Sequence, residues 1–277
     1  MKMENHPQQK DRVREQFTRT AAVFGDYAVA SRVGEAEHLA HLVRAGARDR
    51  AVDLACGPGT LALRFARHVR WICGFDLTPA ILARARRSAA AEELRNIDFA
   101  LGDAQSLPFP DASLDLAVTS YSLHHIPDPA RVIAEMARVV KPGGRVGVLD
   151  IIVPEDPQAA ALNNHIERLR DASHTRTLPH SELASLFQAH GLRILAAEIE
   201  DHAHTFDHWM MVAGWKPGDA PYNEARRVLE QTIPDDAAGF HPRLGPAKPE
   251  KKDASATATT PELHIDNTVL FLAGEKA

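Results

Sequence analysis

Two glycines, Gly57 and Gly59, stand in the sequence Cys-Gly-Pro-Gly-Thr, directly after an apolar stretch that carries Asp53 near its end. Glycine lets a chain turn sharply and bring bare backbone against a ligand, which a Cβ atom would obstruct. We expect a helix to follow, and the free N–H groups at its start would favour a carboxylate or a phosphate. The segment predicts a ligand-binding turn, although a turn that only links a strand to a helix has similar residues.

Two further acids follow the next two apolar stretches. Asp76 ends the stretch WICGFD, 19 residues after Gly57, where it could accept both hydroxyl groups of a ribose. Asp103 lies in a Gly-Asp-Ala turn after the third stretch, where it could accept a hydrogen bond from an adenine amino group. Structural alternatives stay open, because Asp76 could cap the helix that begins at Pro79 and aspartate is also a common turn residue.

Two adjacent histidines could move a proton. His124 and His125 follow the fourth apolar stretch, and imidazole titrates near neutral pH. Either could act as a general base for an acceptor that is protonated at neutral pH, such as a phenol or an ammonium. Asp150, near the end of the fifth stretch, lies on the same rim and could orient a histidine. Alternatively, these side chains cap the sheet or contact a ligand without moving a proton.

A parallel sheet is needed to bring these positions together, and the hydrophobic pattern predicts one. From residue 50 onward, short apolar runs alternate with helix-like stretches, which indicates βαβ crossovers and a sheet covered on both faces. The expected fold class is α/β, with a doubly wound, mostly parallel, seven-stranded, Rossmann-like sheet. Its ligand crevice would lie at the carboxyl ends of the strands. The expected strands are 51–55, 71–76, 97–101, 114–120, 146–152, 192–200 and 263–272.

An insertion at 201–261 interrupts this alternation before the last strand. Its first half is rich in aromatic residues and Met, and its second half has the Pro-rich composition of a mobile loop. The histidines in the segment HAHTFDH have no supporting acid or cysteine pattern, so we expect no metal site. Four apolar side chains could form a wall over an acceptor pocket, or they could be ordinary core. They are Phe206, Trp209, Met210 and Trp215.

Composition limits the partners and the compartment. The chain has 277 residues and a formal net charge of −5, whereas a non-specific nucleic-acid binder would carry a basic excess. No apolar run approaches the roughly 20 residues that span a bilayer, and the first residues lack the apolar stretch of a secretory signal. We therefore expect no nucleic-acid partner, no membrane span and a cytoplasmic location. Cys56 and Cys73 lack the spacing of a metal or disulfide motif.

The glycine turn alone is ambiguous, because Gly57-x-Gly59-x-x-Ala62 also fits the dinucleotide-binding fingerprint. The order of further segments separates the two possibilities. The chain continues with FD at 75–76, then GDAQSLPF, LDLAVTSYSLHHIPDP and RVVKPGGRVGVLD. This succession, over about residues 10–152, resembles the class I S-adenosylmethionine-dependent methyltransferases, and in particular is similar to the ubiquinone and menaquinone biosynthesis methyltransferases.

The resemblance implies that S-adenosylmethionine is the cofactor. Asp53, Gly57 and Gly59 would line its methionine end, Asp76 would bind the ribose, and Ser120 would lie at the methyl-bearing side. The full implied set of cofactor-binding residues is Asp53, Ala55, Gly57, Gly59, Asp76, Leu77, Asp103, Ala104 and Ser120. Leu77, Asp103 and Ala104 are the ones expected at the adenine.

The same resemblance divides the chain into a helical lid and a catalytic domain. Residues 1–46, expected to be helical, would close over the cofactor, and residues 47–277 would form the methyltransferase domain with its insertion. Members of the family often have Tyr where this chain has Phe24. Apolar cover without a hydroxyl contact is therefore expected at that position.

The implied activity is direct displacement of the methyl group onto a small, apolar or aromatic acceptor, with His124 or His125 as the candidate base. Two other classes stay open. One is a protein that binds S-adenosylmethionine or S-adenosylhomocysteine without catalysis. The other is a nicotinamide-dependent oxidoreductase, which is less favoured because a dinucleotide domain does not require Asp53, the Gly-Asp turn or the KPGG turn. The acceptor atom and the oligomeric state do not follow from the sequence.

Overall fold

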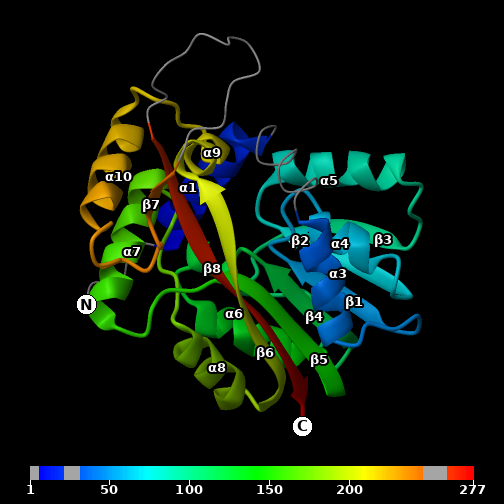
Figure 1. Ribbon diagram of the computed structural model, residues 1–277. Coiled ribbons are helices and arrows are strands. Elements are labelled where there is room, and N and C mark those ends of the chain that lie inside the picture. Colours follow the sequence, from blue (N-terminus) through cyan, green and yellow to red (C-terminus); the bar gives the residue numbers. More distant parts are fainter. Residues whose placement is uncertain (1–5, 22–31, 246–260) are drawn as a thin grey trace.

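The computed structural model describes residues 6–21, 32–245 and 261–277. A twisted sheet lies between helices on its two faces, and further helices gather near one end of two long strands (Figure 1). The strands are β1 (Arg50–Leu54), β2 (Trp71–Asp76), β3 (Ile97–Leu101), β4 (Leu114–Ser120), β5 (Val140–Ile151), β6 (Leu192–Thr205), β7 (Arg243–Gly245) and β8 (Glu262–Lys276). The helices are α1 (His6–Arg19), α3 (Val33–Leu42), α4 (Thr60–Phe65), α5 (Pro79–Ala91), α6 (Pro129–Val139), α7 (Pro157–Arg170), α8 (His180–Ala189), α9 (Phe206–Val212) and α10 (Ala220–Gln231), with a 3-10 turn η1 (Leu123–His125).

The strand order is β3-β2-β1-β4-β5-β8-β6, and β7 pairs with β8 beside this path. The first five strands in chain order pair in parallel, whereas β8 is antiparallel to both β5 and β6. The order reverses between β1 and β4, so the loops that leave these two strands separate and open a crevice. The predicted fold class is confirmed, with one correction to its seven strands. The described sheet has an eighth, β7, whose three residues are too few to show a periodic pattern.

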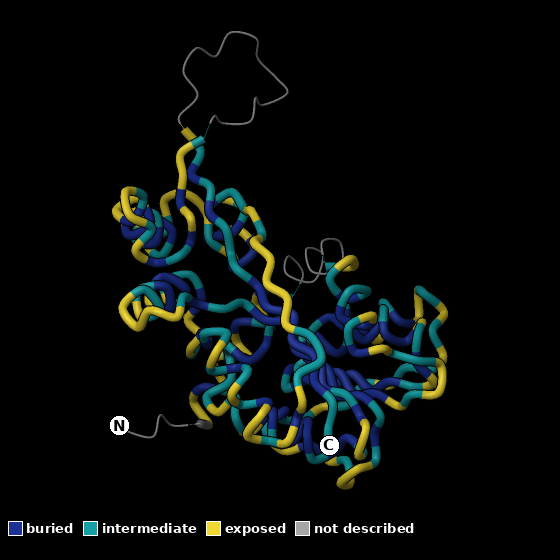
Figure 2. Tube along the Cα trace, turned by 60° about the horizontal axis from the view of Figure 1, so that its bottom comes forward, coloured by how far each residue is buried: buried dark blue, intermediate teal, exposed yellow. Residues whose placement is uncertain are grey.

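Each face of the sheet has its own apolar core. On one face α6 and α8 pack against the sheet through residues such as Ile133 and Phe187, and on the other α3 and α4 pack through residues such as Leu39 and Phe65. The four side chains are fully buried. Figure 2 shows the buried positions concentrated along the central strands. This double cover explains why the strands have nearly continuous apolar sequences.

The end of the β6–β8 ribbon carries a third core, formed with α7, α9 and α10. The insertion was predicted to begin at residue 201, but β6 continues to Thr205 and pairs with the first half of β8. Phe206 and Met210 of α9 are fully buried in this third core, beside Leu263 of β8. The ribbon therefore fixes α9 and α7 relative to the carboxyl ends of the parallel strands.

Side-chain caps set the start of two helices that border the crevice. Asp128 accepts a hydrogen bond from the Arg131 N–H (3.0 Å) at the start of α6, and Pro129 follows it. Asp156 accepts from the Gln158 and Ala159 N–H groups at the start of α7, again followed by a proline. An acidic or polar cap followed by proline at the first helical position is a strong helix start, because proline has no N–H to leave unpaired.

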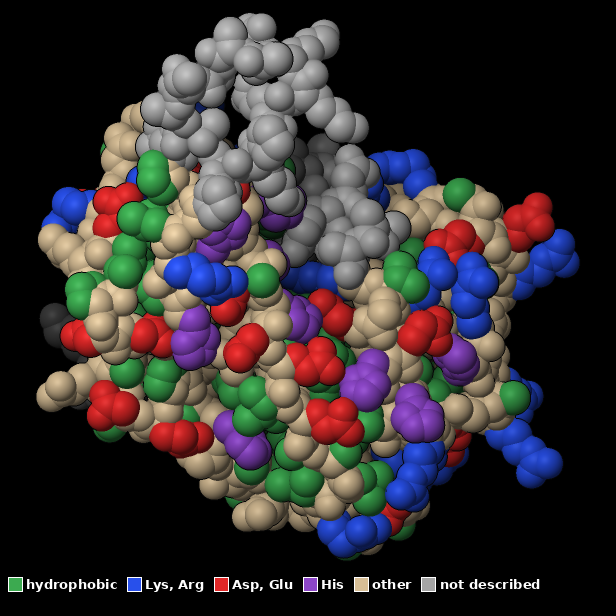
Figure 3. Space-filling view, viewed as in Figure 1, with side chains coloured by type: hydrophobic (Ala, Val, Ile, Leu, Met, Phe, Trp, Pro, Cys, Tyr) green, Lys and Arg blue, Asp and Glu red, His purple; other side chains and the backbone are tan. Residues whose placement is uncertain are grey.

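On the face of the molecule seen in Figure 3, histidine side chains lie beside acidic ones. Contacts of this kind in the described chain include His38 with Glu198 (2.8 Å) and His202 with Glu35 (3.3 Å). Among the described residues, no helix combines the length and the apolar character needed to cross a lipid bilayer. Phe24, for which we predicted apolar cover of the cofactor, lies outside the described residues.

Candidate active site

A cavity of about 1050 Å³, its open mouth included, lies where β1, β2 and β4 end. We call it the first cavity. Its size suits a nucleoside-sized ligand, and its wall contains most of the residues predicted to hold the cofactor. Those residues are Ala55, Gly57, Asp76, Leu77, Asp103, Ala104 and Ser120. Helix α1 closes part of the wall with Lys10 and Phe17.

The turn after β1 has the left-handed backbone that its glycines predict. Ala55, Gly57 and Gly59 all have positive φ, at 50°, 54° and 87°. The Gly57 N–H donates to Asp76 Oδ2 (2.9 Å), so a donor expected to face the ligand is bonded to the neighbouring strand end. Thr60, in the same wall, has a buried Oγ1 atom without a hydrogen-bond partner. A buried hydroxyl without a partner is uncommon in folded proteins.

Asp76 is positioned by both loops that it joins. Its carboxylate accepts from the Gly57 N–H and, at Oδ1, from the Thr78 N–H (2.8 Å), which lies at the start of α5. Burial raises the pKa of Asp76, and these hydrogen bonds partly offset that effect. Thr78 is the N-cap residue of α5, so Asp76 fixes the turn before the helix and does not cap its first N–H groups, while Asp76 also lines the first cavity.

Asp103 has a partner that the sequence analysis did not consider. Lys10 of α1 places its Nζ atom 2.6 Å from Asp103 Oδ2, and the Gln105 N–H donates to Oδ1 (2.9 Å). Partial burial acts to raise the pKa of Asp103, but the Lys10 contact and the Gln105 hydrogen bond outweigh it and the pKa is lowered. Beside it, Gly102 has no room for a side chain, because a Cβ there would lie 2.2 Å from Cζ of Phe75.

Asp53 and Gly59 were also predicted to line the methionine end, and the structure places neither in the cavity wall. Asp53 is fully buried behind the turn and accepts from the Ala62 N–H (3.0 Å) in the first turn of α4. Its other oxygen has no partner, and burial raises the pKa of this carboxyl. Gly59 precedes α4, and a Cβ there would lie 3.1 Å from Ala85. Both residues shape the turn from behind.

A second cavity adjoins the first. Five residues belong to both walls, and the remainder of the second wall comes mainly from α1, α7, β6, α9 and β8. The shared residues are Phe17, Arg32, Glu35, Tyr121 and His125. The two cavities are therefore neighbours, and these five residues border both of them.

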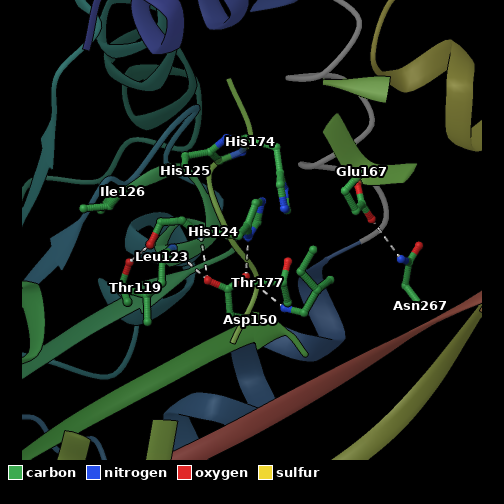
Figure 4. A network of polar contacts seen from close by, with 12 residues as sticks. Thr119, Leu123, His124, His125, Ile126, Asp150, Glu167, His174, Thr177 and Asn267 are labelled. Carbon is green, nitrogen blue, oxygen red and sulfur yellow. Dashed lines mark hydrogen bonds and ion pairs between the residues drawn. The ribbon is translucent and has the colours of Figure 1, made fainter. Parts of the chain in front are cut away.

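His124 lines the second cavity but not the first. Its Nδ1 atom lies 2.6 Å from Asp150 Oδ1, and the side chain of Asp150 is almost fully buried (Figure 4). Asp150 also accepts from three backbone N–H groups, of Ser122, Leu123 and Ile151. Burial alone would lower the pKa of His124, but the Asp150 carboxylate outweighs it and the pKa is raised. Asp150 thus orients a histidine, as the sequence suggested it could.

His125 differs from His124 in its hydrogen-bond partners and in the direction of its pKa shift. Its Nδ1 atom faces the carbonyl oxygen (3.3 Å) and the Oγ atom (3.1 Å) of Ser173, and its ring packs edge-on against Phe17. Burial, with the neighbouring His124 charge as the next cause, lowers the pKa of His125 to about 4. His125 is therefore a neutral, weakly basic residue at the common wall.

The apolar wall expected from the insertion forms only in part. Trp209 lines the second cavity, whereas Phe206 and Met210 lie in the third core and Trp215 packs against it. Much of the remaining wall is polar and includes His202, His204, His208, Arg170 and Asn267. In the described part of the chain, no group of three or more His, Cys, Asp or Glu side chains is arranged to hold a metal ion.

Sequence reasoning missed several residues of these walls. Tyr121 directly follows β4 and has a positive φ of 49°, and only its position after the strand could have indicated it. Glu167 lies in the last turn of α7 and Asp171 directly follows the helix, and their spacing of four places them on one side of it. Nothing in the local pattern shows that this face is buried. No sequence pattern around Lys10, near the start of the chain, indicates its contact with Asp103.

Comparison with known proteins agrees with this geometry. A family model described as a methyltransferase domain matches residues 51–144. The uncharacterized methyltransferase YcgJ of Bacillus subtilis is 32% identical over 216 residues, which cover 77% of this chain and 82% of YcgJ. The crystal structure of YcgJ superimposes with a TM-score of 0.74 at 27% identity, over 88% of this chain and 98% of that one.

Two relatives of stated activity match over shorter regions. The 2-phytyl-1,4-naphtoquinone methyltransferase of Synechococcus elongatus is 41% identical over 116 residues, covering 39% of this chain and 48% of that protein. The 27-O-demethylrifamycin SV methyltransferase of Amycolatopsis mediterranei is 36% identical over 137 residues, covering 49% and 50%. The chain thus matches about half the length of each. These names favour methyl transfer over the nicotinamide-dependent alternative.

Proposed function

The chain belongs to the S-adenosylmethionine-dependent methyltransferases, and we propose that it transfers the methyl group to a hydroxyl of a small molecule held in the second cavity. The observation that carries the proposal is the His124–Asp150 pair: His124 lines the second cavity beside the wall shared with the first, and the buried Asp150 contacts it from behind. A hydroxyl is a poor nucleophile until its proton is removed, and this pair supplies a base in the right place.

We assign the cofactor to the first cavity. The polar groups of its wall fit an adenosine with an amino acid tail: the Asp76 carboxylate can accept from the ribose hydroxyls, and the Asp103 carboxylate from the adenine amino group. Thr60 offers an unpaired hydroxyl to a polar group of the ligand. Bare backbone at Gly57 and Gly102 allows close approach, because neither residue adds a side chain to the wall. Ser120, the last residue of β4, and Tyr121, which follows it, would lie toward the acceptor side.

When bound, S-adenosylmethionine supplies an already activated methyl group on a positively charged sulfur. His124 would accept the hydroxyl proton at Nε2 as the acceptor oxygen forms its bond to the methyl carbon, while the carbon–sulfur bonding pair stays on sulfur. Asp150 fixes the tautomer, because its contact with Nδ1 leaves Nε2 for the cavity. Alignment of the two reactants can supply about 7–11 kcal/mol, so few side chains are needed.

A hydroxyl acceptor is supported by the walls and by the relatives. The second cavity presents polar groups beside Trp209, which suits a molecule with both a flat apolar part and hydroxyls. The name of the rifamycin relative states an oxygen position, and that of the naphthoquinone relative states an aromatic ring system. The acceptor predicted from sequence was simply apolar or aromatic; we propose a hydroxylated one.

We also propose a cytoplasmic enzyme that does not act on nucleic acid. The net charge of −5 and the acidic side chains interleaved with histidine on the face in Figure 3 offer no electrostatic footprint for a phosphate backbone. Both cysteines are buried and free, which suits a reducing compartment.

Three measurements test the proposed function. S-adenosylhomocysteine binding by calorimetry tests the first cavity, and transfer of a labelled methyl group to a panel of small hydroxylated compounds tests the activity. The third compares His124→Gln with a matched surface variant, His41→Gln. We expect transfer to fall by at least about 10²-fold in His124→Gln, as for loss of a general base, with unchanged S-adenosylhomocysteine affinity. Equal transfer by both variants would refute the role of His124.

A further inference from the structure

Three buried carboxylates surround His124, and they differ in how well they are hydrogen-bonded. Asp150 accepts four hydrogen bonds of 2.6–3.2 Å. Asp171 accepts from the Ser173 N–H (2.8 Å) and the Ser173 hydroxyl (2.7 Å). Glu167 of α7 is only 2% exposed, and among the described residues it accepts from two side chains, each at 3.4 Å: Arg170 and, as Figure 4 shows, Asn267.

The guanidinium nearest to Glu167 is held by other partners. Arg170 donates from Nε to the carbonyl oxygen of Trp209 (3.0 Å), and its guanidinium carbon lies 4.7 Å from the centre of the Trp209 ring. These contacts keep Arg170 at the far limit of hydrogen-bond distance from Glu167. A buried carboxylate with no close donor is unfavourable by itself, because it has lost water without gaining an equivalent partner.

Glu167 nevertheless faces a space that can supply the missing donor. It lines the second cavity together with His124, so the same molecule can reach both side chains. We propose that Glu167 determines acceptor specificity by accepting a hydrogen bond from a second polar group of the acceptor, a hydroxyl or an amine, separate from the hydroxyl that is methylated. The acceptor class is therefore a small molecule with at least two hydrogen-bond donors, placed to reach His124 and Glu167.

This arrangement would distinguish acceptors by whether they carry a second hydrogen-bond donor for Glu167. An acceptor with a single hydroxyl would fill the cavity while Glu167 kept only its two long contacts, so its binding would lack one charge-assisted hydrogen bond. A hydrogen bond to a charged group corresponds to a difference of about 10- to 150-fold in affinity. Trp209, on the same wall, would pack against the apolar part of either molecule and would not distinguish them.

This inference rests on the proposed function. The experiment that tests it uses pairs of probes that differ by one hydrogen-bond donor. Phenol is compared with the three benzenediols and the aminophenols, and 2-naphthol with naphthalenediols. Binding of each probe to the S-adenosylhomocysteine complex is measured by saturation-transfer NMR, and methyl transfer is measured as S-adenosylhomocysteine formed. The variants are Glu167→Gln and, as a matched control, Glu230→Gln, an exposed glutamate of α10 that pairs with Arg226 (2.8 Å).

We expect the wild type to prefer at least one two-donor probe over its one-donor partner by about 10-fold or more, mainly in KM. Glu167→Gln should lose most of this preference, whereas Glu230→Gln should keep it. The inference is overturned if no two-donor probe is preferred, or if a folded Glu167→Gln variant keeps the full preference. Failure of S-adenosylhomocysteine to bind would instead refute the proposed function, so the two failures are distinguishable.

Discussion

Replacing Asp150 with asparagine tests the His124–Asp150 pair directly. The four N–H donors that contact Asp150 divide between its two oxygens: Ser122 and Leu123 donate to Oδ2, and His124 and Ile151 to Oδ1. Asparagine keeps one acceptor oxygen and places an NH₂ group at the other position. One pair of donors therefore loses its acceptor, and the negative charge beside the imidazole disappears in either orientation.

The expected sizes follow from those contacts. Each buried donor left without an acceptor costs about 1–3 kcal/mol, so the loss of an acceptor for two donors should lower the free energy of unfolding by about 2–6 kcal/mol. The pair stabilises the fold most between about pH 4 and 6.5, because Asp150 has a lowered pKa and His124 a raised one. Loss of a charge-assisted hydrogen bond of about 1.5–3 kcal/mol predicts a fall of about 10- to 150-fold in kcat/KM.

The assay follows the imidazole of His124 by NMR as a function of pH, with His124→Gln used to assign its signal and Asp111→Asn as an exposed carboxylate control. In the wild type the pKa should lie above 6.5, whereas in Asp150→Asn it should fall below 6.5, because burial then acts without the carboxylate. Since the neutral base is the active form, the rise of kcat/KM with pH should move to lower pH in the variant. A variant that titrates like the wild type would refute the reasoning.

Three further predictions concern the cofactor site and the carboxylate of α7. Asp76→Ala should weaken S-adenosylhomocysteine binding by about 1.5–3 kcal/mol, measured by calorimetry, and unaltered affinity would remove Asp76 from the site. Gly102→Ala, whose Cβ would lie 2.2 Å from Phe75, should lower the free energy of unfolding by about 1–3 kcal/mol, whereas Gly34→Ala, with open space in α3, should leave it unchanged or raise it. Burial raises the pKa of Glu167, so the free energy of unfolding of the wild type should fall as pH rises through the folded-state pKa. Denaturation curves should therefore show Glu167→Gln becoming more stable relative to the wild type across that pH range. A stability difference that does not change with pH would contradict this.

Much of the fold was predictable because its sheet is buried on both faces. The expected strands 71–76, 97–101 and 114–120 match β2, β3 and β4 at both ends. The largest errors lie at two boundaries: β5 begins at Val140 and not at 146, because its first residue pairs with Leu114 of β4, and β6 runs five residues further than expected, to Thr205, because β8 offers it a partner beyond the parallel sheet. A strand extended by a distant partner has no local signal, since its length is set by pairing and not by its own pattern.

The candidate site was predictable where residues follow strand ends and less so where they come from helices packed over the crevice. Asp76 and Asp103 lie in the first cavity because the ends of parallel strands converge. Asp53 was expected at the methionine end of the cofactor, but it lies behind the turn, where its carboxylate accepts a hydrogen bond from the Ala62 N–H. Glu167 was missed because an acid on an amphipathic helix normally faces water, and only the packing of α7 near the crevice buries it.

The adjacent histidines show how neighbours distant in sequence give two identical residue types different roles. His125 stands in the wall common to both cavities, and a protonated imidazole there would repel the positive sulfur of the cofactor. Burial and the neighbouring His124 lower the pKa of His125 to about 4, so it stays neutral at that wall. His124 lines only the second cavity, where Asp150, 26 residues later, compensates the charge that it gains on accepting a proton. In the proposed reaction, the base would therefore be separate from the wall that would face the sulfonium, because of contacts that the His-His sequence alone does not contain.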